Sequence, residues 1–178
     1  MKGIWFDSAR SFVLRRYGPD ALERLVAELP PEIQPVLRDP IVAQWYPEPC
    51  LAHMLAAVRR QLTDGSRSDF MRLLEEITID GVGRFFRLVL SLASPTFVLK
   101  KVPVLWGRMR RGQGRVEVEV RDAIVQVRYA DFPWFDDENY RLMTLATLRG
   151  VARACGARSA WAEPVRWTAD TFVVDVRW

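Results

Sequence analysis

The chain has 178 residues, 49% of them apolar, which is enough to bury the core of one domain. Its 26 basic and 22 acidic residues are interleaved and leave a net charge of +4, a mild excess that is not typical of nucleic-acid-binding proteins. No uncharged run approaches the roughly 20 residues of a membrane-spanning helix, and the start of the chain lacks a secretory signal pattern. Cys50 and Cys155 lack the spacing of a zinc site, so we expect two reduced thiols and a cytoplasmic location.

Residues 1–111 carry apolar side chains at helical spacing, separated by proline and glycine, and we expect about six helices there. Gly18 would end the first helix and Pro19 would begin the second. A proline-broken connection then leads to a third helix, which begins at Pro47 or Glu48.

Three further helices are predicted before residue 112, where the spacing of the apolar residues changes from helical to alternating. Ser66 and Asp69 have the spacing of a capping box, in which each side chain satisfies a backbone N–H at the start of a helix. Gly81 and Gly83 would lead into a very apolar helix, and Ser94 would cap the last one, which Pro103 would kink.

In residues 112–178 the apolar residues first alternate with polar ones, which predicts a hairpin over residues 116–129. Asp136 or Asp137 would cap a long helix that Gly156 ends, and a second hairpin would follow over residues 159–178. The expected fold is therefore α+β: an N-terminal helical layer followed by a β-β-α-β-β antiparallel four-stranded sheet. We expect the two parts, 1–111 and 112–178, to share one core as a single domain.

The opening MKGIWFDSARSFVLRRYGPDALERL resembles the start of heme nitric-oxide/oxygen-binding (H-NOX) domains. The ββαββ order, whose last hairpin finishes on Trp178, is similar to the wider superfamily that joins those domains to 4-vinyl reductase-like domains and to small subunits of vesicle-tethering complexes. Through SPTFVLKKVPVLWGRMRRGQG the chain is also similar to a bacterial family best represented in myxobacteria. The resemblance covers nearly the whole chain, and it implies a scaffold that encloses a flat or elongated apolar ligand.

Heme itself is not expected from this resemblance. Heme-binding members place a histidine in the helix before the sheet and hold the propionates with a Tyr-x-Ser-x-Arg triplet, whereas residues 85–106 contain no histidine and the first hairpin reads VEVEVRDAIVQVRY. We therefore expect no cofactor and no metal. His53, the only histidine, is the outside candidate for a heme ligand, but its position on the third helix predicts an exposed residue. Cys50 and Met54 could ligate a soft metal, but they fit core positions better.

Catalytic motifs are missing from the sequence, which contains no GxSxG, HExxH or phosphate-binding glycine loop, so we expect no enzyme and no catalytic residue. A ligand pocket could be lined by a set of apolar residues that would equally well fill a core. These residues are Trp5, Phe12, Leu55, Phe85, Phe86, Leu90 and Phe97.

Six basic residues lie close together with no acidic residue among them, and we call them the basic surface: Lys100, Lys101, Arg108, Arg110, Arg111 and Arg115. They could be a solvated helix end, or they could bind an acidic protein partner or an anionic membrane. Nucleic acid is disfavoured because interleaved stacking aromatics are missing.

The sequence thus predicts a non-enzymatic domain that senses an apolar small molecule or acts as an adaptor for a partner protein. Two alternatives remain open. One is a purely structural interaction module, such as a homodimer that docks through the basic surface. The other is a heme-binding gas sensor that takes its ligand from His53.

Overall fold

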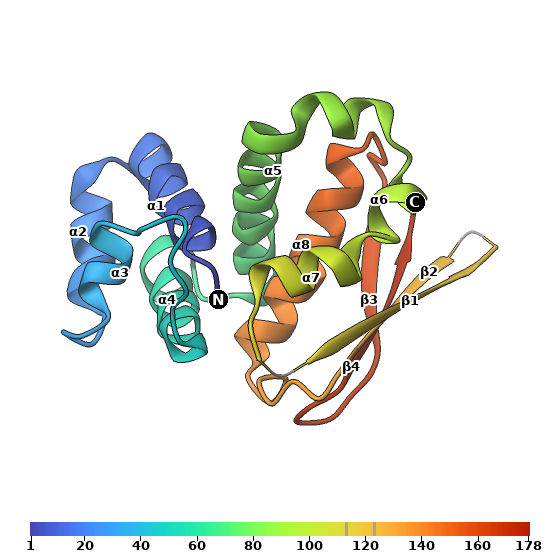
Figure 1. The fold of residues 1–178 in the computed structure, drawn as a ribbon. Coiled ribbons are helices and arrows are strands. Elements are labelled where there is room, and N and C mark those ends of the chain that lie inside the picture. The colour runs from blue at the N-terminus through green and yellow to red at the C-terminus, as the bar shows by residue number, and fades with distance from the viewer. Residues whose placement is uncertain (113, 123) are drawn as a thin grey trace. The chain divides into compact units, whose positions relative to one another are not determined.

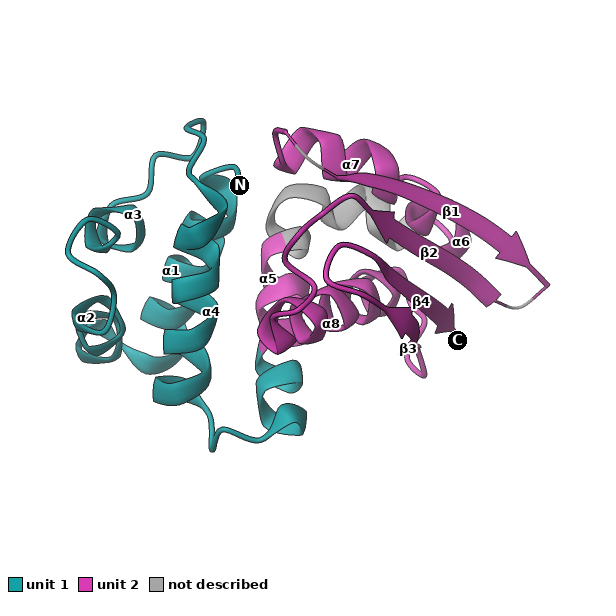
Figure 2. Ribbon diagram, turned by 90° about the horizontal axis from the view of Figure 1, so that it is seen from below, with its two compact units in different colours: residues 1–73 teal, residues 74–178 magenta. Residues whose placement is uncertain are grey.

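The computed structural model describes residues 1–112, 114–122 and 124–178, and for residues 82–92 it describes the backbone alone. The chain divides into two compact units, Met1–Leu73 and Leu74–Trp178 (Figure 2). The boundary lies inside a long helix and not at residue 111, where the sequence pattern changes. A single shared core for the whole chain stays a prediction.

Unit 1 is helical (Figure 1), with α1 (Ile4–Tyr17), α2 (Pro19–Ala27), α3 (Gln34–Arg38), α4 (Glu48–Leu62) and the beginning of α5 (Arg67–Leu92). Gly18, with a φ of 82°, ends α1, and Pro19 begins α2, as predicted. Helix α3 was not expected, because only its buried Val36 and Leu37 distinguish it from a proline-rich connection.

The start of the chain is tied to the segment before α4. The amino group of Met1 donates a hydrogen bond to the carbonyl oxygen of Tyr46 (2.7 Å) and lies 3.3 Å from the Glu48 carboxylate. A Cβ atom on Gly3 would lie 2.0 Å from the carbonyl oxygen of Ile41, so the backbone approaches too closely for any other residue.

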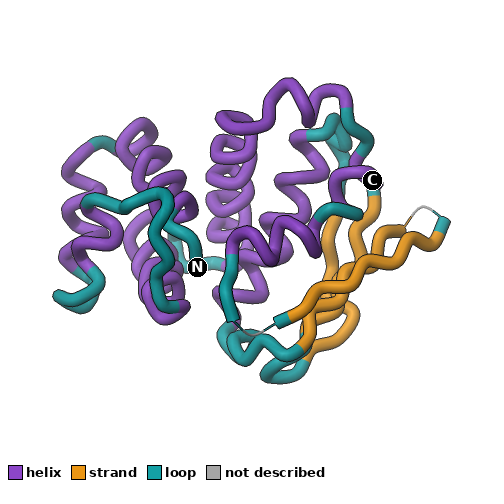
Figure 3. Tube along the Cα trace, in the orientation of Figure 1, coloured by secondary structure: helices purple, strands orange, loops and turns teal. Residues whose placement is uncertain are grey.

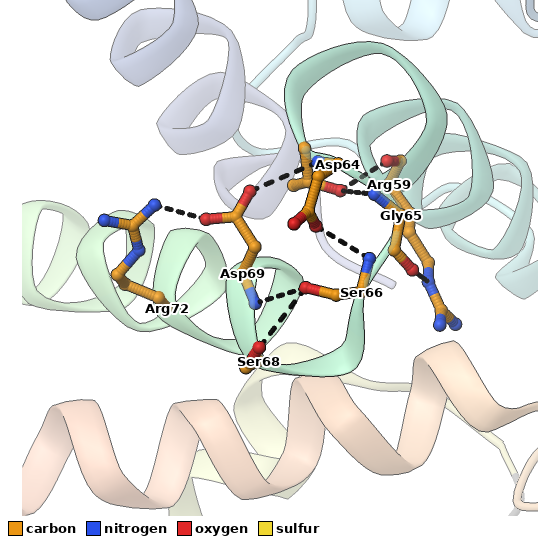
Figure 4. Close-up of polar contacts among 8 residues, drawn as sticks. Arg59, Asp64, Gly65, Ser66, Ser68, Asp69 and Arg72 are labelled. Atoms are coloured by element: carbon orange, nitrogen blue, oxygen red, sulfur yellow. Dashed lines mark hydrogen bonds and ion pairs between the residues drawn. The ribbon is translucent and has the colours of Figure 1, made fainter.

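The turn between α4 and α5 contains the predicted cap (Figure 4). The Asp69 N–H donates to the Ser66 hydroxyl (3.2 Å), as a capping box requires. The reciprocal half differs, because the Asp69 carboxylate accepts from the Asp64 N–H (3.3 Å) and pairs with Arg72. The Ser66 N–H donates instead to Asp64 (2.8 Å), and a local network of side chains replaces the box.

Unit 2 contains the rest of α5 together with α6 (Pro95–Leu99), α7 (Val102–Met109), β1 (Arg115–Arg121), β2 (Ile124–Ala130), α8 (Glu138–Ala154), β3 (Trp161–Trp167) and β4 (Phe172–Arg177). The predicted boundary at Gly81 is wrong, since α5 continues through it. The predicted kink at Pro103 is also wrong: the chain forms two helices, and Pro103 lies in the first turn of α7, where its missing N–H costs no helical hydrogen bond.

Both predicted hairpins belong to one antiparallel sheet with the strand order β1-β2-β4-β3 (Figure 3). Val118 pairs with Val127, and Val127 pairs with Val174 on the next strand. Val127 and Val174 are fully buried, and α8 contacts β3 and β4. Asp137 caps α8 by accepting from the Asn139 N–H (2.7 Å), as predicted. The α+β fold with a four-stranded antiparallel sheet is therefore confirmed.

Helices α5 and α8 approach closely at a glycine. A Cβ atom on Gly150 would lie 3.0 Å from Cβ and Cγ2 of Thr78. Beside this contact, the Glu75 carboxylate pairs with Arg149 (3.2 Å) and with Arg153. Glu75 is only 4% exposed, and the two guanidinium groups of α8 balance its charge inside the unit. No helix in the described part of the chain combines the length and the apolar character needed to cross a bilayer.

Replacing Gly150 with Ala is expected to lower the free energy of unfolding of unit 2 by about 1–3 kcal/mol, because the added methyl group must displace Thr78. Urea unfolding followed by circular dichroism measures this change. Gly107→Ala is the matched control, since it also lies in a helix of unit 2 and its Cβ would meet no atom within 4 Å. The control should be neutral or stabilising by up to about 1 kcal/mol. Equal losses in both variants would contradict the close approach of α5 and α8.

Candidate functional site

The residues predicted to line a pocket are divided between the two units by their positions in the chain. Phe12 and Leu55 are buried in unit 1, where Trp5 is half-buried. Phe97, in unit 2, is 54% exposed. The side chains of the remaining three, at positions 85, 86 and 90, lie outside the described residues. The pocket therefore stays a prediction.

His53 is exposed on α4, as its position predicts, and its neighbours Cys50 and Met54 are buried. Burial raises the pKa of the Cys50 thiol and so disfavours the thiolate that a metal would need. In the described part of the chain, no group of three or more His, Cys, Asp or Glu residues could hold a metal ion.

The basic surface is not uniform. Five of its residues are exposed, but Arg110 is half-buried. Arg115 forms an ion pair with Asp131 (3.1 Å). The guanidinium of Arg110 stacks 3.9 Å from the centroid of the Trp106 ring and 5.0 Å from that of Phe132. The exposed cations that remain on α6, α7 and their connection are Lys100, Lys101 and Arg108.

Seven aromatic side chains of unit 2 form a connected cluster, with neighbouring ring centroids 5.0–6.0 Å apart, and we call it the aromatic cluster. Its members are Trp106, Tyr129, Phe132, Trp134, Phe135, Tyr140 and Phe172. They come from α7, β2, the loop before α8, α8 and β4, so the cluster joins the sheet to two helices. None of the predictions from the sequence included this cluster, although the density of aromatic residues in YADFPWFDDENY could have indicated it.

Within the aromatic cluster, Tyr129 has a strongly shifted pKa. Burial raises the pKa of its phenol well above the usual value, and the nearby Arg110 guanidinium opposes this only weakly. Tyr129 therefore stays a neutral phenol and is not available as a phenolate ligand. The chain passes close to the cluster at Gly114, whose φ is +102° and whose Cβ would lie 3.2 Å from Phe132 and from Trp106.

No family model and no curated protein matches this sequence. Solved structures, however, match over nearly the whole chain. An H-NOX protein from S. oneidensis in the Fe(II)NO ligation state is 14% identical, with a TM-score of 0.67 over 99% of this chain and 98% of that one. The Fe(II) unliganded H-NOX protein from K. algicida is 11% identical, with a TM-score of 0.67 over 99% and 96%. A further structure, from work on heme distortion in the H-NOX family, is 12% identical, with a TM-score of 0.69 over 100% and 95%. The chain therefore has an H-NOX-like fold.

These comparisons contradict the expectation of no cofactor, since the structures that share the fold include H-NOX proteins described by their iron and heme states. The expectation was wrong because it took the missing histidine and the missing Tyr-x-Ser-x-Arg triplet as sufficient grounds to exclude a cofactor. A flat apolar ligand is held mainly by the apolar surface that encloses it, and an iron ligand can also come from Cys, Tyr or Met.

The donor atoms of this chain do not fit heme held by a histidine beside the sheet. His53 is exposed on α4, and unit 2 contains no histidine. Burial raises the pKa of the Cys155 thiol, as it does for the Tyr129 phenol, so both groups stay protonated. Residues 82–92, whose side chains are not described, contain no His, Cys, Tyr or Met. Neither His53 nor Cys155 nor Tyr129 is therefore assigned as an axial ligand.

The raised pKa of Tyr129 predicts a loss of stability in alkaline solution. The unfolded phenol loses its proton above about pH 10, whereas the folded one keeps it, so the unfolded state binds fewer protons. The free energy of unfolding should then fall by about 1.4 kcal/mol for each pH unit above that point. Urea unfolding at several pH values should show a slope that is smaller by this amount in Tyr129→Phe than in the wild type, and the Cys50 and Cys155 thiols, whose pKa is also raised by burial, account for slope that remains. Tyr17→Phe, at a 40% exposed side chain, is the control, and a slope unchanged by Tyr129→Phe would refute the assignment.

Proposed function

We propose that this chain is a non-enzymatic sensing domain that binds a flat apolar ligand, and that heme is the ligand to test first. The proposal rests on one observation: the fold matches H-NOX proteins over nearly the whole chain, at a TM-score of 0.67 over 99% of this chain and 98% of the S. oneidensis protein. A shared fold by itself does not determine function. The ligand must therefore be established by direct binding.

The absence of catalysis is part of this proposal. Nucleophilic catalysis needs a nucleophile activated by a neighbouring base or by a lowered pKa. Burial raises the pKa of both Cys50 and Cys155, so neither thiol is activated. The buried carboxylate of Glu75 is already paired with Arg149 and Arg153, which suits a structural role. These features support binding over turnover.

Adding hemin to the purified full-length chain is expected to produce a Soret absorption band that saturates at a single heme per chain. We expect the band to persist in His53→Ala, because His53 is exposed and its imidazole is not part of a buried site. Gln61→Ala, at another exposed position of α4, is the matched control. Absorption spectroscopy of the three proteins, oxidised and reduced, makes the measurement.

Any other result of these titrations changes the assignment of the ligand. Loss of the band in His53→Ala but not in Gln61→Ala would show that His53 is the ligand and that our expectation for it is wrong. A titration without saturation would exclude heme. Denaturing extraction and mass spectrometry would then identify any other apolar ligand that co-purifies, and repeated empty extracts would refute the sensing proposal.

A further inference from the structure

Helices α6 and α7 are anchored through their inward side chains. Val98 and Leu99 of α6 are buried, and Val98 packs against Val151 of α8. On α7, the centroid of the Trp106 ring lies 5.1 Å from that of Tyr129 and 5.0 Å from that of Phe132, both in the aromatic cluster. The segment is therefore held in place from one side, and its other side chains are exposed because of this arrangement and not because the helices are loosely packed.

The outward side of the same segment combines apolar and cationic residues, and we call it the α6–α7 face: Phe97, Lys100, Lys101, Val104 and Arg108. Phe97 is 54% exposed and Val104 is 53% exposed. The three cations are also exposed. Basic residues together with exposed apolar side chains are typical of helices that lie at a membrane interface.

The cations and the apolar side chains alternate along this face. The ammonium group of Lys101 lies 5.3 Å from the centroid of the Phe97 ring. Val104 follows Lys101 by three residues, and Arg108 lies one helical turn beyond Val104, so all three project from one side of α7. The apolar side chains are therefore interspersed with positive charge and do not form a separate patch.

The positive charge of the α6–α7 face is not neutralised by nearby carboxylates. Residues 94–116 contain no Asp or Glu. Among the described residues, Lys100, Lys101 and Arg108 form no ion pair. An anionic partner would therefore meet positive charge that no internal carboxylate offsets.

We propose that the α6–α7 face docks on a membrane surface that contains anionic lipids, a function beyond ligand sensing and independent of it. The central position of Lys100 and Lys101 favours a membrane over a protein. The centre of a protein interface is depleted in lysine. At a bilayer surface, by contrast, lysine stems lie along the apolar region while their ammonium groups reach the phosphates, and Phe and Val side chains enter between the headgroups. Contact is peripheral, and it weakens as salt rises.

Sedimentation of the full chain with vesicles tests the proposal. Binding is expected to vesicles of phosphatidylcholine mixed with phosphatidylserine, but not to phosphatidylcholine alone. Because each basic residue near such a surface contributes about fivefold in affinity, Lys100→Glu with Lys101→Glu should weaken binding by about tenfold or more. Phe97→Ser with Val104→Ser should also weaken binding, while the remaining binding stays sensitive to salt.

Two double variants serve as matched controls. Arg16→Glu with Arg24→Glu changes the net charge equally at exposed positions of α1 and α2, and Ile41→Ser with Val42→Ser removes two exposed apolar side chains from unit 1. Both should bind vesicles as the wild type does. Circular dichroism establishes that every variant is folded.

The proposal is overturned if anionic vesicles do not bind at low salt, or if the lysine variant binds them as well as the wild type. Equal binding to phosphatidylcholine alone overturns it too. If vesicles fail but polyglutamate binds through Lys100 and Lys101, the face serves an acidic protein and the membrane proposal is wrong. Hemin binding is measured separately, so failure here does not affect the proposed function.

Discussion

The packing of α8 is the constraint on which unit 2 depends. On one side Gly150 allows Thr78 of α5 to lie against the backbone of α8, and the paired charges of Glu75 and the arginines of α8 lie beside that contact. Elsewhere α8 contacts α6 and the strands β3 and β4. Because α8 contacts two helices as well as the sheet, a change in its packing affects α5, α6, β3 and β4 together. Interiors packed at this density do not deform gradually.

The aromatic cluster extends this constraint to α7. None of the α7 side chains is buried, so the helix has no core of its own, and Trp106 connects it to Tyr129 and Phe132. Arg110 covers the same rings, and burial keeps the Tyr129 phenol neutral. The position of α7, and with it the exposed side of the α6–α7 segment, therefore follows from aromatic contacts with the sheet.

The H-NOX-like fold supports the proposal of a bound ligand such as heme, whereas the donor atoms of the chain do not include the histidine that would hold heme beside the sheet. The fold of the H-NOX structures extends over nearly the whole of this chain. The histidine that the resemblance would place before the sheet is missing, and the only histidine is exposed on α4. A scaffold can be kept while the chemistry of its site changes, because packing depends on the apolar pattern and ligation depends on a few side chains. The sensing role is a proposal drawn from the architecture, and the identity of the ligand has to come from binding measurements.

The sequence by itself determined the features that depend on local order. Alternating residues predicted both hairpins, and Ser94 and Asp137 predicted helix starts, because a cap or a strand period is defined within a few residues. Only the tertiary structure decided the continuity of α5, the burial of Glu75 and the assembly of the aromatic cluster. Glu75 has its partners 74 and 78 residues away on α8, and Trp106 meets Phe132 across a whole hairpin. Such contacts form only when distant segments pack together, and no local pattern records them.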